Sequence, residues 1–320
     1  MRQTLAIYLV RHTSGAFCAA VLVALLIVSG CSQSPVGNDT SVSTADSQPL
    51  VFVAVPNQQA PLLRESFQSI LDMLQKETGR EVRFVSATDY NAVIEGLRTG
   101  SIQIANLGPF SYVIAKDQGV QITVVAAQVT NENGSRGYQS YGITRPGLPI
   151  KSLAGFRGKK VCFVDRASTS GYLYPIAGLL EVGIGPDEDI TPIFVGGHDA
   201  SVISVINGQC DAGFAYDTMV DRQLIERGQI MPGQIATVWK SSIIPGAPLV
   251  IANNLPPELF KKLQGALQYK ANIDYLRANG FCKVRCGIPR GDAYSYVRAS
   301  DADYNSVREV CRITRDKSCH

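Results

Sequence analysis

The sequence lacks the features that mark several large classes of protein. It has no block of lysine or arginine residues, and its formal net charge is only +3 over 320 residues, so nucleic acid is not an expected partner. It contains neither a Gly-x4-Gly-Lys-Ser/Thr phosphate loop nor a Gly-x-Ser-x-Gly nucleophile elbow. Its three histidines do not cluster with carboxylates at metal-ligand spacing. We therefore expect no catalytic residues, no metal and no cofactor.

The N-terminus carries the pattern of an export signal. Arg2 and Arg11 form a basic start, and residues 16–28 are an apolar and small-residue run that is too short to span a membrane comfortably. Small residues before Cys31 resemble the lipobox of bacterial lipoproteins, which implies that residues 1–30 are removed and that Cys31 carries the lipid. The alternative is an uncleaved single-span anchor. Either reading places the rest of the chain outside the cytoplasm, on the outward side of the cell membrane.

Residues 31–49 are polar, small and nearly free of large apolar side chains. Such a segment cannot bury enough apolar surface to offset the entropy lost on ordering, so we expect a flexible tether. The folded part would then begin near Leu50. About 270 residues remain after that point, which is enough for two domains of ordinary size.

Six cysteines remain in this exported part of the chain, and an even number in an oxidising compartment argues for disulfides. The candidates are Cys162, Cys210, Cys282, Cys286, Cys311 and Cys319. Cys162 and Cys210 both begin strand-like runs, so a bridge between them is one pairing that the pattern allows. The other four crowd the C-terminal segment and would staple it, with their pairing left open. A zinc site is the alternative, but the spacings do not form a familiar zinc pair.

Strand-like and helix-like segments alternate along the folded part. Residues 50–55 are rich in β-branched side chains, residues 61–78 have apolar residues at helical spacing, and the alternation restarts over residues 160–216. This pattern predicts an α/β fold of mostly parallel sheets with helices on both faces. A faint similarity between residues 89–106 and 198–214 is consistent with two α/β units that face each other across a cleft, or with chance likeness of two amphipathic helices.

The most informative stretch is Ser168-Thr169-Ser170-Gly171, which joins an expected strand to an expected helix. Ligands of open α/β sheets bind at the carboxyl ends of strands. A helix N-terminus there offers unpaired N–H groups and a partial positive charge, and the hydroxyl groups add hydrogen-bond donors. The stretch therefore predicts an anion site that needs no lysine. The alternative is a simple helix cap formed by Ser168 or Ser170.

Four further residues could complete this site. Asp217 ends an expected strand, and its carboxylate would accept a proton from the ligand and so favour a protonated oxyanion over sulfate. His198 follows two glycines and could donate to an oxyanion, and Tyr90 and Tyr138 could donate their hydroxyls. Each of these residues could instead have a purely structural role, as a helix cap or in packing. A triad of Ser170, His198 and Asp217 is a further alternative, without the elbow that a hydrolase would need.

Several stretches resemble the family of ABC-transporter solute-binding proteins that bind phosphonate, phosphate and phosphite. The matching stretches are Lys76–Val82, Ala87–Glu95, Asn106–Val113, Gly137–Tyr138, Ser168–Tyr172, Gly197–His198, Asp211–Asp217 and Trp239–Pro248. The resemblance implies a type II periplasmic-binding-protein fold with a two-strand hinge and a ligand between two lobes. Lobe 1 would comprise residues 50–140 plus 245–320, and lobe 2 residues 141–244.

The resemblance also assigns roles and partners. Family members hold the phosphorus oxyanion with hydroxyls, helix N-termini, tyrosines and a histidine, which implies these roles here for Ser168, Thr169, Ser170, Tyr90, Tyr138 and His198. Asp217 would take the ligand's proton. The expected partners are a small phosphorus oxyanion, an ABC permease with its ATPase, and the membrane through the lipid on Cys31. We expect the protein to be a monomer.

One departure from the family pattern bears on the ligand. Relatives that bind an aminoalkylphosphonate have an acidic residue where this chain has Ala247, and its loss removes a charge partner for an amine. The sequence therefore favours phosphate, phosphite or a simple alkylphosphonate. The same fold with another small ligand, a sensory role and an exported phosphoester hydrolase remain open as alternatives.

Overall fold

The computed structural model describes residues 48–129, 137–282, 286, 288 and 293–319. The expected signal peptide, Cys31 and nearly all of the expected tether lie outside these residues. Within the described ranges, no helix combines the length and the apolar character needed to cross a membrane.

A six-stranded sheet forms the framework of what we call the first lobe, with strands drawn from residues 50–129 and 248–298. In spatial order the strands are β13 (Ser295–Arg298), β4 (Ile122–Val129), β12 (Pro248–Ala252), β3 (Ile104–Asn106), β1 (Leu50–Ala54) and β2 (Val82–Ser86). β1 is parallel to β2 and β3, whereas β12 is antiparallel to β3 and β4, and β13 is antiparallel to β4.

Helices cover both faces of this sheet because the side chains of β1 alternate between them. The helices are α1 (Ala60–Thr78), α2 (Tyr90–Arg98), α3 (Pro109–Asp117), α7 (Pro257–Tyr269) and α8 (Ile273–Ala278). Leu50 and Phe52 join a core with apolar residues of α1 and α7, while Val53 joins the opposite core with residues of α2 and α3. The sheet is therefore buried on both sides, as expected for strands linked by crossover helices.

A five-stranded sheet forms the second lobe, with strands drawn from residues 140–240. In spatial order they are β10 (Ala236–Lys240), β6 (Ser140–Thr144), β9 (Ala212–Tyr216), β7 (Lys160–Phe163) and β8 (Thr191–Phe194). The helical elements are η2 (Leu153–Phe156), η3 (Thr169–Leu173), α4 (Tyr174–Glu181), α5 (His198–Ile206), η4 (Met219–Gln223) and α6 (Leu224–Glu226). β7 is parallel to β8 and β9, whereas β6 is antiparallel to β9 and β10.

The sheets are mixed because the chain crosses between them twice. The crossings pass through β5 (Gly137–Tyr138) and β11 (Ile244–Pro245), which pair antiparallel as a separate ribbon. β6 follows the first crossing and β12 follows the second, so each enters its sheet from the other lobe. A strand that enters in this way starts beside the carboxyl ends of the parallel strands and therefore runs against them.

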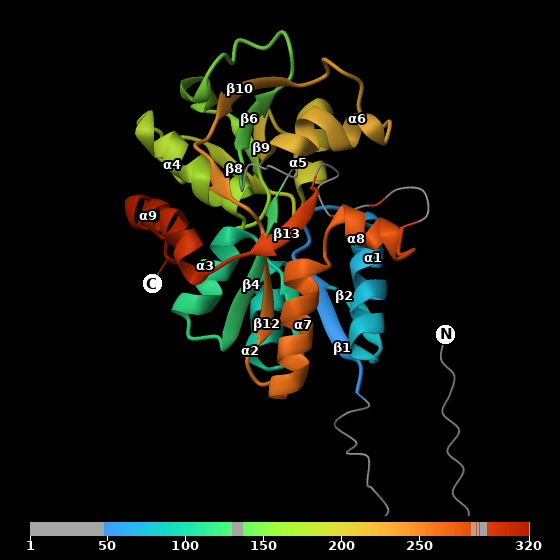
Figure 1. The fold of residues 1–320 in the computed structure, drawn as a ribbon. Coiled ribbons are helices and arrows are strands. Elements are labelled where there is room, and N and C mark those ends of the chain that lie inside the picture. Colours follow the sequence, from blue (N-terminus) through green and yellow to red (C-terminus); the bar gives the residue numbers. More distant parts are fainter. Residues whose placement is uncertain (1–47, 130–136, 283–285, 287, 289–292, 320) are drawn as a thin grey trace, which may run out of the picture. The chain divides into compact units, whose positions relative to one another are not determined.

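The C-terminal segment contacts both lobes. It contains η5 (Asp301–Tyr304) and α9 (Asn305–Thr314), and α9 packs against α3 of the first lobe and α4 of the second. Figure 1 shows α9 in red beside these two helices. The segment thus spans the junction between the lobes.

Three disulfides join the six candidate cysteines in the pairs Cys162–Cys210, Cys282–Cys286 and Cys311–Cys319. The first links β7 to Cys210, which lies two residues before β9 in the second lobe. The other two close short loops in the C-terminal part of the chain. The expectation of disulfides is confirmed. Among the described residues, no group of histidine, cysteine and acidic side chains is placed to hold a metal ion.

Candidate ligand-binding site between the two sheets

A small cavity of about 20 Å³ lies between the two lobes. Its walls are formed by Val55, Asn57, Tyr90, Asn106, Leu107, Gly108, Tyr138, Ser168, Thr169, Ser170, His198 and Ala247. These residues come from strand ends and loops of both lobes and from the β5 crossing. Within the described part of the chain, no lysine, arginine or carboxylate residue belongs to the wall.

Four helical elements begin at this cavity. Tyr90 is the first residue of α2 and His198 the first of α5, while Gly108 and Ser168 are the residues that precede α3 and η3. A helix N-terminus carries a partial positive charge, and its first N–H groups lack partners within the helix. The convergence of these helix starts creates an environment for an anion without any cationic side chain.

The serine and threonine hydroxyls of residues Ser168–Gly171, which we call the anion loop, are arranged as donors. Ser168 Oγ accepts the N–H of Gly171 at 3.1 Å, and Thr169 Oγ1 accepts the N–H of Phe110 at 2.8 Å. With the oxygen already accepting from the backbone, each hydroxyl proton is left to donate elsewhere. Ser170 lies in the same wall and is 1% exposed. The predicted run Ser168–Ser170 is therefore brought together at one wall of the cavity.

Gly171 allows this loop to close. A side-chain carbon at this position would lie 2.4 Å from Val164 and 2.8 Å from Ser168 Oγ. Such distances are far below van der Waals contact, so any larger residue would push the loop off the strand end. Glycine is thus required here because Val164 and Ser168 leave no room for a side chain, and not because of its backbone angles.

His198 is oriented by the backbone of the neighbouring strand. Its Nδ1 accepts the N–H of Tyr216 at 3.2 Å, so in the neutral ring the proton resides on Nε2. Nε2 lies 3.5 Å from Ser168 Oγ, on the cavity side. The structure thus brings His198 into the same cavity wall as the Ser168–Ser170 run.

Tyr90 and Tyr138 both contribute to the cavity wall and are 2% and 6% exposed. The N–H of Tyr90 donates to Asp165 Oδ2 at 3.5 Å, and Oδ1 of the same carboxylate accepts from Ala167 at 2.8 Å. Burial raises the pKa of Asp165, and these backbone donors act against that rise. The carboxylate thus supports the loop from behind and is not part of the wall.

Asp217 does not take the position that the sequence suggested. Its Oδ2 accepts the N–H of Gln139 at 2.9 Å and its Oδ1 accepts the N–H of Thr218 at 2.8 Å. It is absent from the cavity wall as the structure describes it. Both oxygens accept from backbone donors, so Asp217 holds the β5–β6 connection.

Asn57 and Asn106 belong to the wall, and the sequence argument did not assign them a role. Asn106 ends β3, and Asn57 lies three residues beyond the end of β1. A signal was present, because both polar residues follow parallel strands at the edge where ligands bind. Asn106 also stood inside one of the family-like stretches.

Hydrogen bonds join the two lobes around the cavity. Besides the Phe110–Thr169 contact, the N–H of His198 donates to Asn57 O at 2.9 Å, and the N–H of Gln59 donates to Asp199 Oδ2 at 3.0 Å. Each bond links a loop of the first lobe to the start of a helix in the second. These bonds therefore hold the two lobes together beside the cavity.

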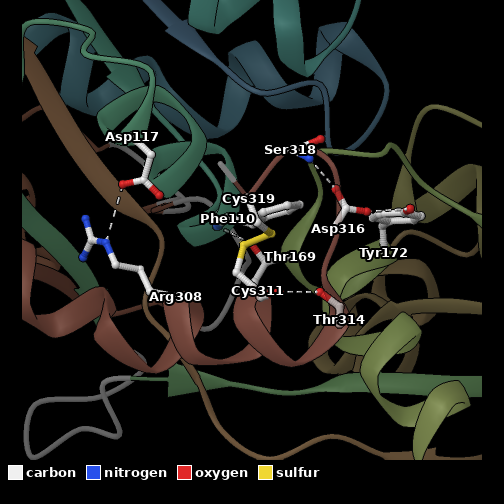
Figure 2. Close-up of a disulfide and its surroundings, with 10 residues drawn as sticks. All are labelled: Phe110, Asp117, Thr169, Tyr172, Arg308, Cys311, Thr314, Asp316, Ser318 and Cys319. Atoms are coloured by element: carbon white, nitrogen blue, oxygen red, sulfur yellow. Dashed lines mark hydrogen bonds and ion pairs between the residues drawn. A yellow bond between two sulfur atoms is a disulfide. The ribbon is translucent and has the colours of Figure 1, made fainter.

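The C-terminal segment braces the anion loop from outside. Figure 2 shows the Tyr172 hydroxyl donating to Asp316 Oδ2, at 2.8 Å, beside the Cys311–Cys319 disulfide. On the first lobe, Arg308 lies 3.7 Å from the carboxylate of Asp117. The C-terminal segment is thus connected to η3, whose hydroxyls line the cavity, as well as to α3.

The comparisons with known proteins identify the family. A sequence profile described as ABC transporter, phosphonate, periplasmic substrate-binding protein matches residues 52–280. The chain belongs to this family. The phosphate-import protein PhnD of Mycolicibacterium smegmatis is 43% identical over 312 residues, which cover 94% of this chain and 96% of that protein.

Solved structures share the fold. The PhnD1 protein of Prochlorococcus marinus in complex with methylphosphonate has a TM-score of 0.71 and 21% identity, and covers 82% of this chain and 97% of its own. A binding protein component of an ABC phosphonate transporter from Pseudomonas aeruginosa has a TM-score of 0.74 and 22% identity, over 84% and 87% of the two chains. The expected type II periplasmic-binding-protein fold is confirmed.

Family membership defines the general role of this chain. It is the substrate-binding component of an ABC importer for phosphonate or phosphate, which implies a permease and an ATPase and a location outside the cytoplasm. It is not an enzyme. The side chains agree, because His198 Nδ1 faces the N–H of Tyr216 and not the carboxylate of Asp217, so Ser170, His198 and Asp217 do not form a catalytic triad.

Proposed function

We propose that this protein captures a small phosphorus oxyanion without an amino group, namely phosphate, phosphite or a simple alkylphosphonate. The observation that carries the proposal is the convergence of four helix starts and the Ser168–Ser170 hydroxyls on one cavity that has no cationic side chain among the described residues. Such a set of neutral donors matches a tetrahedral oxyanion.

Ala247 supports the exclusion of amines. It contributes to the cavity wall, and the described wall residues include no carboxylate that could pair with an ammonium group. Burying an unpaired ammonium is unfavourable, so 2-aminoethylphosphonate should bind less well than methylphosphonate. The relative from M. smegmatis, which is named for phosphate import, also points to a ligand without an amine.

Isothermal titration calorimetry with phosphate, phosphite, methylphosphonate and 2-aminoethylphosphonate tests this proposal. We expect binding of at least one of the first three and binding of the aminated ligand at least tenfold weaker. Equal or tighter binding of 2-aminoethylphosphonate would contradict the argument from Ala247. No binding of any phosphorus oxyanion would contradict the proposed ligand class.

We also propose that residues 1–30 are a signal peptide and that the mature protein is a monomer held at the outer face of the cell membrane by a lipid on Cys31. The small residues before Cys31 and the polar residues 31–49 support this proposal. Metabolic labelling with a radioactive fatty acid should label the wild type and not Cys31→Ala. Equal labelling of both would contradict the anchor. Light scattering of the protein without its lipid should give the mass of one chain.

A further inference from the structure

The cavity wall contains hydrogen-bond acceptors as well as the donors described above, and a site that only donates to an anion would not need them. Ser168 and Thr169 each have an oxygen that accepts from the backbone and a proton left to donate. A ligand that only accepts hydrogen bonds would be satisfied by these groups alone. Two asparagine side chains share the same wall, and their amide oxygens can only accept.

The amide of Asn106 is fixed with its oxygen available. Its Nδ2 donates to Pro248 O at 3.2 Å and to Tyr296 Oη at 3.3 Å. A carbonyl oxygen such as that of Pro248 can only accept, so the amide cannot turn over without losing this bond. With both N–H protons used, the group that Asn106 offers to the cavity is Oδ1.

Asn57 carries a second acceptor without a partner in the described part of the chain. Its Oδ1 is buried and has no hydrogen-bond partner among the described residues. Its backbone oxygen accepts the N–H of His198 at 2.9 Å, which holds the residue beside the anion loop. A buried acceptor without a partner is costly, and a donor supplied by the ligand would remove that cost.

We infer that the site takes its oxyanion in a protonated form, whose O–H group donates to the amide oxygens of Asn57 and Asn106. This inference rests on the proposed function and names the proton acceptors that Asp217 was expected to supply. Phosphite, methylphosphonate and phosphate carry such a proton near neutral pH, and sulfate does not. Sulfate has no proton to donate. Its oxygens would lie against the two amide oxygens, and the like partial charges would repel.

Titratable groups of the protein could also produce a pH effect, and the test must separate them. Those that face the two asparagines or the cavity from the surrounding elements are His198 and Asp199 on α5, Asp165 before η3, Tyr90 on α2, Tyr138 on β5 and Tyr296 on β13. A protein group would shift the binding of every oxyanion at one common pH. If the ligand's own proton is responsible, binding should weaken at a different pH for each ligand.

The first experiment is calorimetric titration of phosphite, methylphosphonate and sulfate between pH 5.5 and pH 9. We expect the Kd of phosphite and methylphosphonate to rise by about tenfold per pH unit once the ligand has lost its last proton. The rise should begin at lower pH for phosphite, which is the stronger acid. We expect sulfate to bind at least a hundredfold more weakly than phosphite at pH 6. A common onset for both ligands, or no rise, would overturn the inference.

The second experiment uses variants of the acceptors. We expect Asn57→Ala and Asn106→Ala each to weaken methylphosphonate binding about tenfold at pH 6, with little change in the weak binding of sulfate. Asn253→Ala is the matched control, because Asn253 is an exposed asparagine just beyond the opposite end of β12. If Asn106→Ala does not fold, Asn57→Ala decides the outcome. Wild-type affinity in Asn57→Ala, or an equal loss for sulfate, would overturn the inference.

The outcomes also separate this inference from the proposed function. If the wild type binds no phosphorus oxyanion at any pH, the proposed function fails. If it binds them with an affinity that does not follow the ligand's ionisation, the proposed function stands and only the role of Asn57 and Asn106 fails.

Discussion

Tyr172 donates its hydroxyl to Asp316 Oδ2 at 2.8 Å, and this bond joins the helix that follows the anion loop to the C-terminal disulfide loop. Tyr172 lies two residues after Ser170, and Asp316 lies inside the loop closed by Cys311 and Cys319. Burial raises the pKa of Tyr172, and the charge of Asp316 raises it further. The hydroxyl therefore stays protonated at neutral pH and acts as a donor to Asp316.

Removing this bond should lower stability. We expect Tyr172→Phe to lower the free energy of unfolding by about 1 kcal/mol, because the buried ring stays in place while the hydroxyl loses its bond to Asp316 and the weaker one from Arg166. Urea denaturation followed by circular dichroism measures the change. Tyr269→Phe is the control, since Tyr269 is 70% exposed. An equal effect of both substitutions would mean that the Asp316 contact adds nothing.

Removing the disulfides Cys162–Cys210 and Cys311–Cys319 should lower the free energy of unfolding by different amounts. Cys162–Cys210 closes a loop with a sequence separation of 48, and Cys311–Cys319 one of 8. Because loop-closure entropy grows with loop length, we expect removal of the first bridge to cost about 4 kcal/mol and of the second about 2.5 kcal/mol. Double Cys→Ser variants compared by denaturant unfolding give both values. A larger loss for the shorter loop would show that contacts of the C-terminal segment, and not chain entropy, dominate.

Ser168 should be essential for affinity. Its hydroxyl proton is free to donate because Oγ accepts from Gly171. We expect Ser168→Ala to weaken binding of the preferred oxyanion by more than tenfold, which is about 1.4 kcal/mol or more. Calorimetry measures the affinity, and thermal melting without ligand checks that the fold persists. Wild-type affinity in this variant would remove Ser168 from the contacts with the ligand.

Ala247 should control the response to amines. It lies in the cavity wall and is 5% exposed. A carboxylate there would pair with an ammonium group and repel an oxyanion that lacks one. We expect Ala247→Asp to improve 2-aminoethylphosphonate binding relative to methylphosphonate by at least tenfold, measured as the ratio of the two dissociation constants. Ala247→Asn, which adds similar volume without the charge, is the control and should not change that ratio by as much.

Asp217 should matter for structure more than for the ligand. Both of its carboxylate oxygens accept backbone N–H groups, one of them from Gln139 beside the β5 crossing. We expect Asp217→Ala to lower the free energy of unfolding by about 1 to 2 kcal/mol. Affinity for phosphite at pH 6 should change less than in Ser168→Ala. A loss of affinity larger than that of Ser168→Ala, with stability unchanged, would restore Asp217 as a contact with the ligand.

Features that depend on neighbouring residues could be predicted before the fold was known. The alternation of strands and helices, the run Ser168–Ser170 at a strand end and the histidine after two glycines are local patterns, and local patterns follow from backbone and side-chain periodicity. The α/β class and the converging donors could therefore be predicted without coordinates.

The side chains that line the cavity and the pairing of the cysteines depend on contacts between segments far apart in the sequence. Asp217 is held by Gln139, 78 residues away, and Asn106 by Pro248, 142 residues away. Such partners are brought together by the two crossings between the sheets, and no pattern in the neighbouring sequence records them. For this reason the donors of the site could be read from the sequence, while its acceptors appear only when both lobes are folded.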